Sequence, residues 1–279
     1  MRPVQFGRLA TNVVSGVLAV IFVFPFYVLV SAAFKTPQEM DQPPPTYFPH
    51  SFTLENFADL STLGNGIWVH IGNSALLGLI TVVGTISVSM LGGWGFARYR
   101  FPGQRLIFIL MLSALMVPYQ PLLTPLFLVL KWLHLQNSRF GLGLVYITFQ
   151  LPFALFVMRN AFLDIPQEIE DAARVDGASG FTMLWAVFIP LVRPAIVTVG
   201  LFAFFSAWNE FLSPLVLLSD QSEFPLPVAL RSAIVSGLTG VNWSLLQAGV
   251  LVTMLPCLIL FFIFQRYYAS GLVAGAVKG

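Results

Sequence analysis

The chain has 279 residues, of which 57% are hydrophobic and 9% are charged. Soluble proteins carry about a quarter charged residues, so this chain has too few charges to cover the surface of a soluble domain. The formal net charge of +2, with no long basic run, argues against a nucleic-acid partner. The single cysteine, Cys257, excludes an intrachain disulfide and a cysteine-based metal site.

The charged residues are unevenly spaced and leave long apolar stretches. No Asp, Glu, Lys or Arg occurs between Arg8 and Lys35 or between Arg105 and Lys131. Stretches of this kind approach the roughly 20 apolar residues that cross a bilayer as a helix. The sequence therefore predicts an all-α, polytopic membrane protein with six transmembrane helices. We place them at residues 10–34, 68–94, 106–130, 140–159, 195–218 and 244–265.

The first span follows Arg2 and Arg8, as a secretory signal would. Its apolar run is longer than the core of a cleavable signal, so we expect it to be retained. Residues 1–66 are predicted to form the first transmembrane helix and a proline-rich outer loop, which is stiff and extended. Residues 67–279 are predicted to form the main transmembrane domain.

The second and third spans have contrasting compositions. Small residues in the second span let neighbouring helices approach closely, and they are Gly78, Gly84, Ser87, Gly92 and Gly93. Prolines in the third span disrupt helical hydrogen bonding, and they are Pro118, Pro121 and Pro125. We expect the second span to pack inside the protein and the third to be broken or kinked where it lines a cavity.

The positive charges predict the orientation in the membrane. With the N-terminus inside, ten of the 14 Lys and Arg residues lie on the cytoplasmic side and four lie outside. Both termini are therefore expected in the cytoplasm. The same arrangement makes residues 160–194 a long cytoplasmic loop.

This loop carries the signals of two short helices. Asp164 and Pro166 are typical of a helix start, and Gly177 of a helix end. Between them Ile169, Ala172 and Ala173 are predicted to share one face. After Gly177, Ser179 can cap a second helix that runs through Phe181, Leu184, Trp185 and Phe188 to Ile189. Such a hairpin suits docking into a groove of a cytoplasmic partner, and a solvated hairpin without a partner is the alternative.

Five sequence motifs in the chain resemble one family of transport proteins. They are EDAARVDGAS at Glu170 with IPLVRP at Ile189, NSALLG at Asn73, GFARYRFPG at Gly95, WNEFLSPLVLL at Trp208 and QRYYASGLVAGAVKG at Gln265. Taken in chain order, from Asn73 to the C-terminal tail, these motifs resemble the permeases of binding-protein-dependent ABC importers, specifically the second, maltose-type permease subunit of the carbohydrate-uptake class. The resemblance covers the chain from the second span to the C-terminus. Asp171 departs from the glutamate usual in that family, and Ile189 from the leucine.

The resemblance implies a fold, partners and a role for the loop. The fold is the type I ABC importer permease fold, and the loop contains the coupling helix that docks on an ATP-hydrolysing subunit. By matching positions, the coupling residues are Glu170, Asp171, Ala172, Ala173, Asp176, Gly177 and Ala178. The implied partners are a sister permease, two ATP-binding subunits, an extracytoplasmic solute-binding protein and membrane lipid, in the cytoplasmic (inner) membrane.

ATP hydrolysis is expected in a partner and not in this chain. The three lysines are Lys35, Lys131 and Lys278, and none completes a glycine-rich phosphate loop. The chain is therefore predicted to be a transport subunit and not an enzyme. It is expected to hold no cofactor itself, with ATP and magnesium bound by the ATPase.

The candidate substrate pathway lies inside the membrane. Glu210 is costly at this depth unless it is paired or faces water, and Trp208 and Asn209 beside it suit a sugar. Tyr119 and Gln120, next to the proline break, are second candidates. The alternative is that Glu210 pairs with a neighbouring helix or lies at the end of a span.

Two functions other than an importer permease are alternatives for this sequence. A stand-alone secondary transporter or channel is disfavoured because the halves show no detectable repeat and few ionisable residues lie in the spans. A membrane scaffold without transport is the third possibility. The solute stays open between a sugar, another polyol and glycerol phosphate.

Overall fold

The computed structural model describes residues 3–62, 64–235 and 241–276, and within these ranges the ordered elements are all helical. Four helices contain stretches long and apolar enough to span a membrane: Thr11–Ala33, Ile67–Arg98, Arg139–Leu163 and Trp243–Gln265. Two bent helix pairs also qualify, which gives six spans if each pair counts as one. The all-α membrane fold predicted from the sequence is confirmed.

The chain forms two compact units, Met1–Ile67 with Leu230–Pro256 and Trp68–Ala229 with Cys257–Gly279. The first unit contains α1 (Pro3–Ala33), α2 (Pro37–Asp41) and α3 (Glu55–Ser61). Helices α13 (Leu226–Val235) and α14 (Trp243–Ala276) each contribute to both units. The predicted boundary at residue 66 stays a prediction.

The loop after α1 is held by polar contacts in the first unit. The buried Asn56 donates to the carbonyls of Ala33 (2.9 Å) and Lys35 (2.8 Å). The Glu39 carboxylate accepts from the amide of His50 (3.0 Å) and the hydroxyl of Thr46 (2.8 Å). Burial raises the pKa of Glu39, but these hydrogen bonds outweigh it and hold the pKa below its usual value. The loop therefore has a defined structure of its own.

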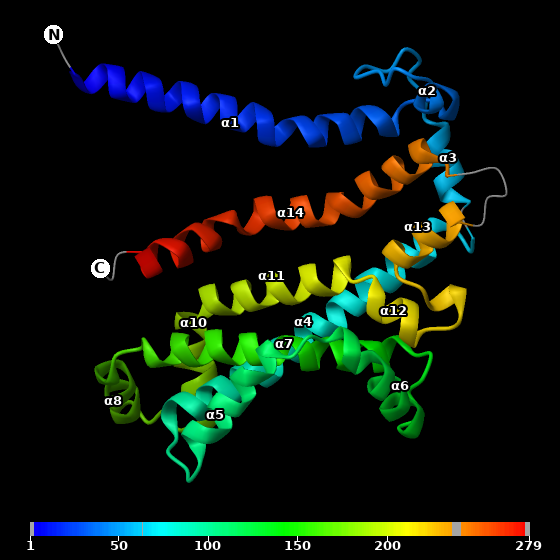
Figure 1. Ribbon diagram of the computed structural model, residues 1–279. Coiled ribbons are helices and arrows are strands. Elements are labelled where there is room, and N and C mark those ends of the chain that lie inside the picture. Colours follow the sequence, from blue (N-terminus) through cyan, green and yellow to red (C-terminus); the bar gives the residue numbers. More distant parts are fainter. Residues whose placement is uncertain (1–2, 63, 236–240, 277–279) are drawn as a thin grey trace. The chain divides into compact units, whose positions relative to one another are not determined.

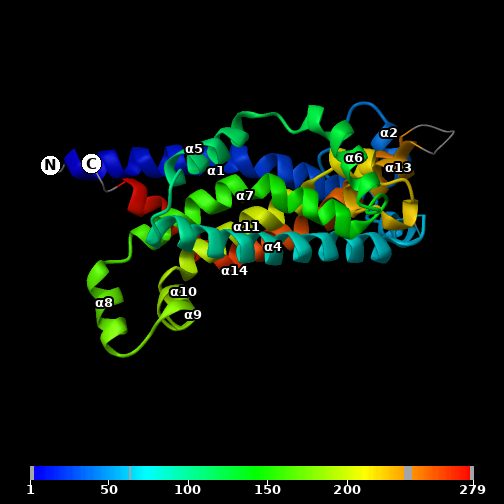
Figure 2. The same cartoon turned by 90° about the horizontal axis from the view of Figure 1, so that it is seen from below.

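The second unit is built around three long helices that lie side by side (Figures 1 and 2). They are α4 (Ile67–Arg98), α7 (Arg139–Leu163) and α11 (Arg193–Asn209). Figure 2 shows α4 running the length of this unit, from the end near α6 to the end near α8. One buried cluster around Leu142 and Leu217 fills the first end, and another around Met158 and Phe188 fills the second.

The third predicted span is a bent pair. It consists of α5 (Gln104–Ser113) with the 3₁₀ turn Ala114–Met116, and the 3₁₀ turn Gln120–Leu122 with α6 (Leu123–Trp132). The two halves meet at 98°, which confirms the predicted break. Pro118 lies in the break itself, whereas Pro125 lies in the first turn of α6, where its missing amide proton costs no helical hydrogen bond.

The fifth predicted span is shorter than expected. Residues 195–218 were predicted as one helix, but α11 ends at Asn209 and α12 spans Leu212–Leu217. Glu210 is extended (φ −69°, ψ 131°), and its carboxylate accepts hydrogen bonds from the amides of Leu212 and Ser213, both at 3.0 Å. The side chain thereby replaces the helical partners of these amides and starts a new helix.

Helices α4 and α7 pack closely because glycines face their neighbours. A Cβ placed on Gly84 or Gly92 of α4 would lie under 3.0 Å from side-chain atoms of α7. At Gly93 the added Cβ would lie 2.7 Å from Met158 Cβ and 2.9 Å from the backbone nitrogen of Arg159. The predicted inward packing of this span is confirmed. At Gly93 the obstacle includes backbone, which a side-chain rotation cannot relieve.

We predict that Gly93→Ala destabilises the protein by about 1–3 kcal/mol, the usual cost of overpacking a tight contact. Gly95→Ala is the matched control on the same helix, because nothing lies within 4 Å of its added Cβ. Thermal unfolding in detergent measures both variants. Equal melting temperatures for the two would contradict the close packing of α4 on α7.

Candidate functional site

A short helix, α8, projects from the end of the second unit and is the first candidate site (Figure 2). It spans Gln167–Val175, with Glu168 and Glu170 in its first turn and Arg174 in its last, which matches the helix dipole. Gly177 has φ +86°, and the amide of Ala178 donates to the carbonyl of Ala173 (2.9 Å). The predicted stop at Gly177 is confirmed, because a left-handed residue ends the helix there.

The start of α8 differs in one residue from the prediction. Pro166 occupies the N-cap position without a side-chain cap, whereas Asp164 lies at the C-cap of α7. The predicted helix start is confirmed at Pro166, whereas Asp164 lies two residues before the N-cap position. The proline explains the difference, because it excludes the preceding residue from helical geometry and so separates α7 from α8.

Arg98, the last residue of α4, anchors α8. Its Nη2 donates to the carbonyl of Ile165 (2.9 Å), and its Nε lies 3.3 Å from Oε2 of Glu170. The guanidinium also lies 5.2 Å from the centre of the Phe188 ring. Glu170 is 6% exposed and pairs in addition with Arg174 (2.5 Å). A buried carboxylate is tolerated only when it is paired, so these arginines determine which face of α8 is turned inward.

The opposite face of α8 is exposed. Val175 is 88% exposed, and Ile169, Asp171, Ala172 and Asp176 are also exposed. Ala173 instead packs with Ala178 against the buried cluster around Phe188. Ile169, Ala172 and Ala173 share one side of α8 by helical spacing, as predicted, but Ala173 lies at the inner edge of that side and is partly buried. The exposed residues combine apolar side chains with three carboxylates, those of Glu168, Asp171 and Asp176.

The second predicted helix of this loop is present but irregular. It consists of α9 (Gly180–Thr182), the π-helical turn Met183–Phe188 and α10 (Ile189–Leu191), and it meets α11 at 79°. Ser179 occupies the N-cap position of α9, although its side chain makes no capping hydrogen bond. Leu184 and Phe188 are buried, whereas Phe181 and Trp185 are exposed. The inner side of α8 packs against this segment.

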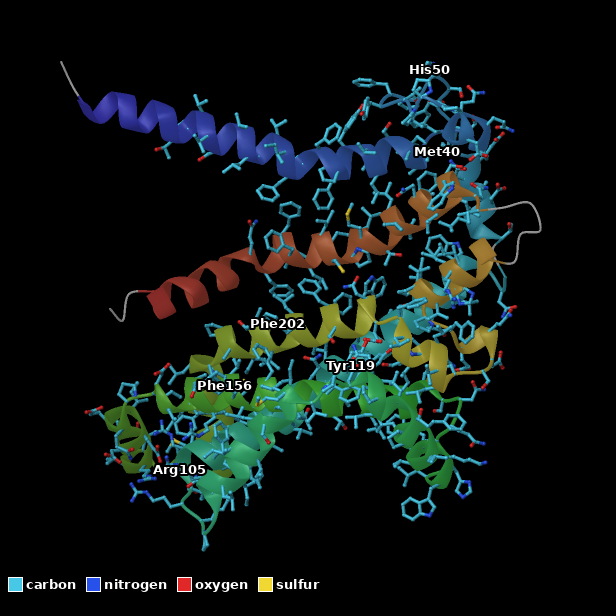
Figure 3. All side chains as sticks on the ribbon, viewed as in Figure 1. Met40, His50, Arg105, Tyr119, Phe156 and Phe202 are labelled. Atoms are coloured by element: carbon cyan, nitrogen blue, oxygen red, sulfur yellow. The ribbon has the colours of Figure 1, made fainter. Side chains whose placement is uncertain are left out.

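The second candidate site is a cavity of about 420 Å³ beside the break between α5 and α6. Tyr119 and Glu210 both line it, and the Tyr119 hydroxyl lies 3.4 Å from Oε1 of Glu210. Figure 3 shows Tyr119 on the side of the break that faces the other helices of this unit. The remaining lining residues are Ala114, Leu115, Val117, Pro118, Gln120, Tyr146, Phe149, Gln150 and Ser206.

Polar groups gather in this cavity around aromatic rings. Gln150 of α7 donates to the Ser206 hydroxyl of α11 at 2.6 Å. The Tyr146 hydroxyl is buried and has no hydrogen-bond partner among the described residues. A buried hydroxyl without a partner is costly, so a movement of the lining that exposes it to water or to a solute would be favoured. Rings beside hydroxyl and amide groups are the combination that sugars require.

Glu210 has a structural role as well as a place in the cavity. Its Oε1 accepts from two backbone amides and from the hydroxyls of Ser213 (3.1 Å) and Tyr119. Among the described residues no hydrogen bond to its Oε2 occurs. The carboxylate lies at the end of a span, as the structural interpretation predicted, and it also lines the cavity, whereas its role in a substrate pathway stays a prediction.

The other two pathway candidates lie outside the cavity lining. Trp208 is 3% exposed and stacks on Phe204, with ring centres 5.3 Å apart. Asn209 donates to the carbonyl of Phe205 at 2.8 Å and lies 3.9 Å from the sulfur of Cys257. Of the five pathway residues, the cavity brings together Tyr119, Gln120 and Glu210.

Several residues of these sites were missed from the sequence. Arg98 was included only as part of the GFARYRFPG motif, and Tyr146, Gln150 and Ser206 were not singled out. A signal for Gln150 existed, because a glutamine in the middle of an apolar span needs a polar partner or water. Tyr146 carries no comparable signal, since a tyrosine in a span is ordinarily an apolar side chain with a polar tip.

We predict that Glu210→Ala lowers the stability by about 1 kcal/mol, the usual cost of losing a side-chain cap. Glu210→Gln is the matched control, because its amide oxygen still accepts from the amides of Leu212 and Ser213. Thermal unfolding in detergent compares the two. If both variants lose the same stability, the capping role of this carboxylate is wrong.

Comparison with known proteins identifies the family. Residues 86–273 match the family described as binding-protein-dependent transport system inner membrane component. The chain is 34% identical over 264 residues to the arabinooligosaccharides transport system permease protein AraQ of Halalkalibacterium halodurans, covering 94% of this chain and 93% of that protein. It is 32% identical over 279 residues to the diacetylchitobiose uptake system permease protein DasC of Streptomyces coelicolor, covering both in full (100%).

Solved structures share the fold. A chain of a bacterial ABC transporter involved in import of the acidic polysaccharide alginate matches with a TM-score of 0.82 at 23% identity, covering 96% of this chain and 98% of that one. A chain of the bacterial alginate transporter in complex with an alginate pentasaccharide-bound periplasmic protein matches with a TM-score of 0.66 at 13% identity, covering 95% and 96%. With its match to the family and its importer fold, the chain belongs to the binding-protein-dependent transport system inner membrane components.

Proposed function

We propose that the chain is a permease subunit of an ATP-driven ABC importer that moves a sugar or oligosaccharide across the inner membrane. The observation that carries the proposal is the exposed outer face of α8, which lies opposite a buried ion pair on the inner side of the helix. A helix of nine residues is too short to be stable alone. Its rigid mounting on α4 and its open face suit a surface that receives force from a partner.

The coupling residues divide into two groups on this proposal. Asp171, Ala172 and Asp176 are exposed and contact the ATPase. Glu170 and Ala173 face inward and hold the helix in place. Gly177 ends the helix, and the adjacent Ala178 packs on the cluster beneath it.

The orientation proposed from the sequence places the α8 end in the cytoplasm, together with both termini. The charge distribution of the second unit supports it. The α8 end carries Arg98, Arg100, Arg105, Arg159, Arg174 and Arg193, and Figure 3 shows Arg105 at that end. Lys131 and Arg139 lie towards the other end, and such a bias is typical of the cytoplasmic side.

Transport proceeds by alternating access on this proposal. Two partner ATPases bind ATP and magnesium, close on each other and displace α8 of this chain and the equivalent helix of a sister permease. The helix bundle then switches between openings on the two sides of the membrane. A solute-binding protein delivers the solute at the end opposite to α8.

The cavity favours a neutral, polyhydroxylated solute. Its described lining offers tyrosine, glutamine and serine side chains and one carboxylate, Glu210, but no lysine, arginine or histidine. Glycerol phosphate, the alternative solute, would approach a carboxylate there without a compensating cation. The relatives AraQ and DasC are named for oligosaccharide substrates, which supports the same class.

We predict that Asp171→Lys and Gly177→Leu each abolish solute uptake, while the subunit still inserts in the membrane. The first reverses a charge on the exposed face, and the second forces a side chain into the left-handed region. Lys131→Glu is the control, because it reverses an exposed charge at the other end. Uptake is measured with labelled sugar in cells. Normal uptake in both α8 variants would contradict the docking role.

Crosslinking tests the partner directly. A photoreactive residue at Ala172 or Val175 is expected to capture a nucleotide-hydrolysing protein in cells, whereas one at the buried Met183 is not. Mass spectrometry identifies the captured protein. If the exposed positions never yield an ATPase, the importer assignment is wrong.

We predict that Tyr146→Phe and Gln150→Leu raise the apparent KM for the sugar by about two- to tenfold, the range expected for one hydrogen bond. Thr148→Val on the same helix is the control, because its hydroxyl bonds only to the carbonyl of Leu144 among the described residues. Uptake kinetics in proteoliposomes measure the change. An unaltered KM in both variants would place the solute elsewhere.

A further inference from the structure

We propose that α4 is the rod that links movement of α8 to the segment 219–226 at the opposite end of the second unit, with Arg98 and Asn73 as its positioning residues. The inference rests on the proposed function, since it concerns how docking at α8 reaches the far side of the membrane. The start of α4, at the opposite end of the helix from Arg98, is also fixed by side-chain hydrogen bonds.

Three polar residues near the start of α4 hold the segment 219–226. Asn73 donates to the carbonyls of Ser222 (2.7 Å) and Phe224 (3.1 Å). His70 Nδ1 lies 2.9 Å from the same Phe224 carbonyl and must donate to it, since a carbonyl only accepts. The Ser74 hydroxyl accepts from the amide of Leu226 (2.8 Å). All three α4 side chains are at most 4% exposed, so water does not compete for these bonds.

A neighbouring charge pair strengthens this attachment. Arg139, the first residue of α7, donates to Oδ1 of Asn73 at 2.6 Å and pairs with Glu223 at 2.6 Å. Asn73 therefore uses its donor group and its acceptor oxygen at once. The segment 219–226 cannot shift relative to α4 without breaking several of these bonds together.

Helix α4 is suited to transmit displacement because it is continuous. It has 32 residues and no proline, whereas the other three of the four longest helices contain Pro25, Pro152 and Pro256. A proline removes a backbone hydrogen bond and softens a helix at that point. The third span is bent by 98°, and α11 breaks at Glu210. Among the described helices of 25 or more residues, α4 is the one without a proline.

The two attachments are far apart along this rod. At 1.5 Å per residue, Asn73 and Arg98 are separated by about 38 Å. Substitutions this distant ordinarily have independent effects on free energy. If α4 transmits force, however, releasing either end removes the same link. A double variant should then lose little more than the larger single loss.

The experiment is a double-mutant cycle on Arg98→Met and Asn73→Leu in the assembled transporter. Sugar uptake per ATP hydrolysed is measured in proteoliposomes. Each single variant is expected to lower this ratio by about tenfold, within the usual range for coupling between sites. The double variant is expected to match the larger single loss. Multiplied losses, or an unchanged ratio in either single variant, would overturn the rod.

Asn137→Gly is the matched control at the far end. Asn137 Oδ1 accepts from the amides of Ser219 (2.8 Å) and Asp220 (3.0 Å), so it holds the same segment through hydrogen bonds in which α4 takes no part. Its φ of +50° is one that glycine adopts freely. Any loss it causes is expected to multiply with that of Arg98→Met. If it fails to multiply, segment stability rather than α4 explains the result, and the rod is wrong.

Two further measurements keep the outcomes separate. If Arg98→Met does not insert in the membrane, the cycle is repeated with Arg98→Lys and Asn73→Ser. Lysine keeps the positive charge but cannot make all the contacts of a guanidinium. Arg100→Met removes an exposed arginine two residues from Arg98 and should leave the ratio unchanged. Failure of the wild-type chain to capture an ATPase refutes the proposed function, whereas normal capture with independent losses refutes only the rod.

Discussion

A single buried ion pair determines how this protein presents its exposed helix. Glu170 of α8 lies in a nearly closed environment and is neutralised by Arg98 of α4, with Arg174 alongside. Without Arg98 this buried carboxylate would lose its partner from α4, and an unpaired buried charge is strongly destabilising. The ion pair thus fixes which side of α8 faces the protein and which faces outward. A helix this short is not stable alone, so its orientation depends on such contacts.

The membrane helices extend this arrangement in two ways. Glycines let α4 and α7 approach until side chains interlock, which gives the second unit a rigid wall. Opposite this wall the third span breaks, and polar side chains from α7 and α11 meet the break in a cavity. The closely packed helices α4 and α7 therefore differ in position from the broken third span, which lies beside the cavity.

Composition and proline spacing predicted most of the spans and the broken third helix, and the glycine signal predicted the stop of α8 at Gly177. The fifth span was predicted as one helix but breaks at Glu210. The inward face of α8 was not predictable, because a hydrophobic pattern does not anticipate a buried glutamate such as Glu170. Glu210 was recognised as unusual, but its capping role depends on where α11 ends. That end is set by contacts of the carboxylate itself, which only the folded chain brings into place.

The sharp break at Val117–Tyr119 has a consequence for the barrier properties of the membrane. Amide and carbonyl groups that leave a helix need water or protein partners, because hydrocarbon solvates neither. The adjoining cavity offers room for water beside these groups. Protection against leakage of protons and small ions must then come from whatever surface covers the open side of the cavity, and a lone copy of this chain would be an incomplete seal.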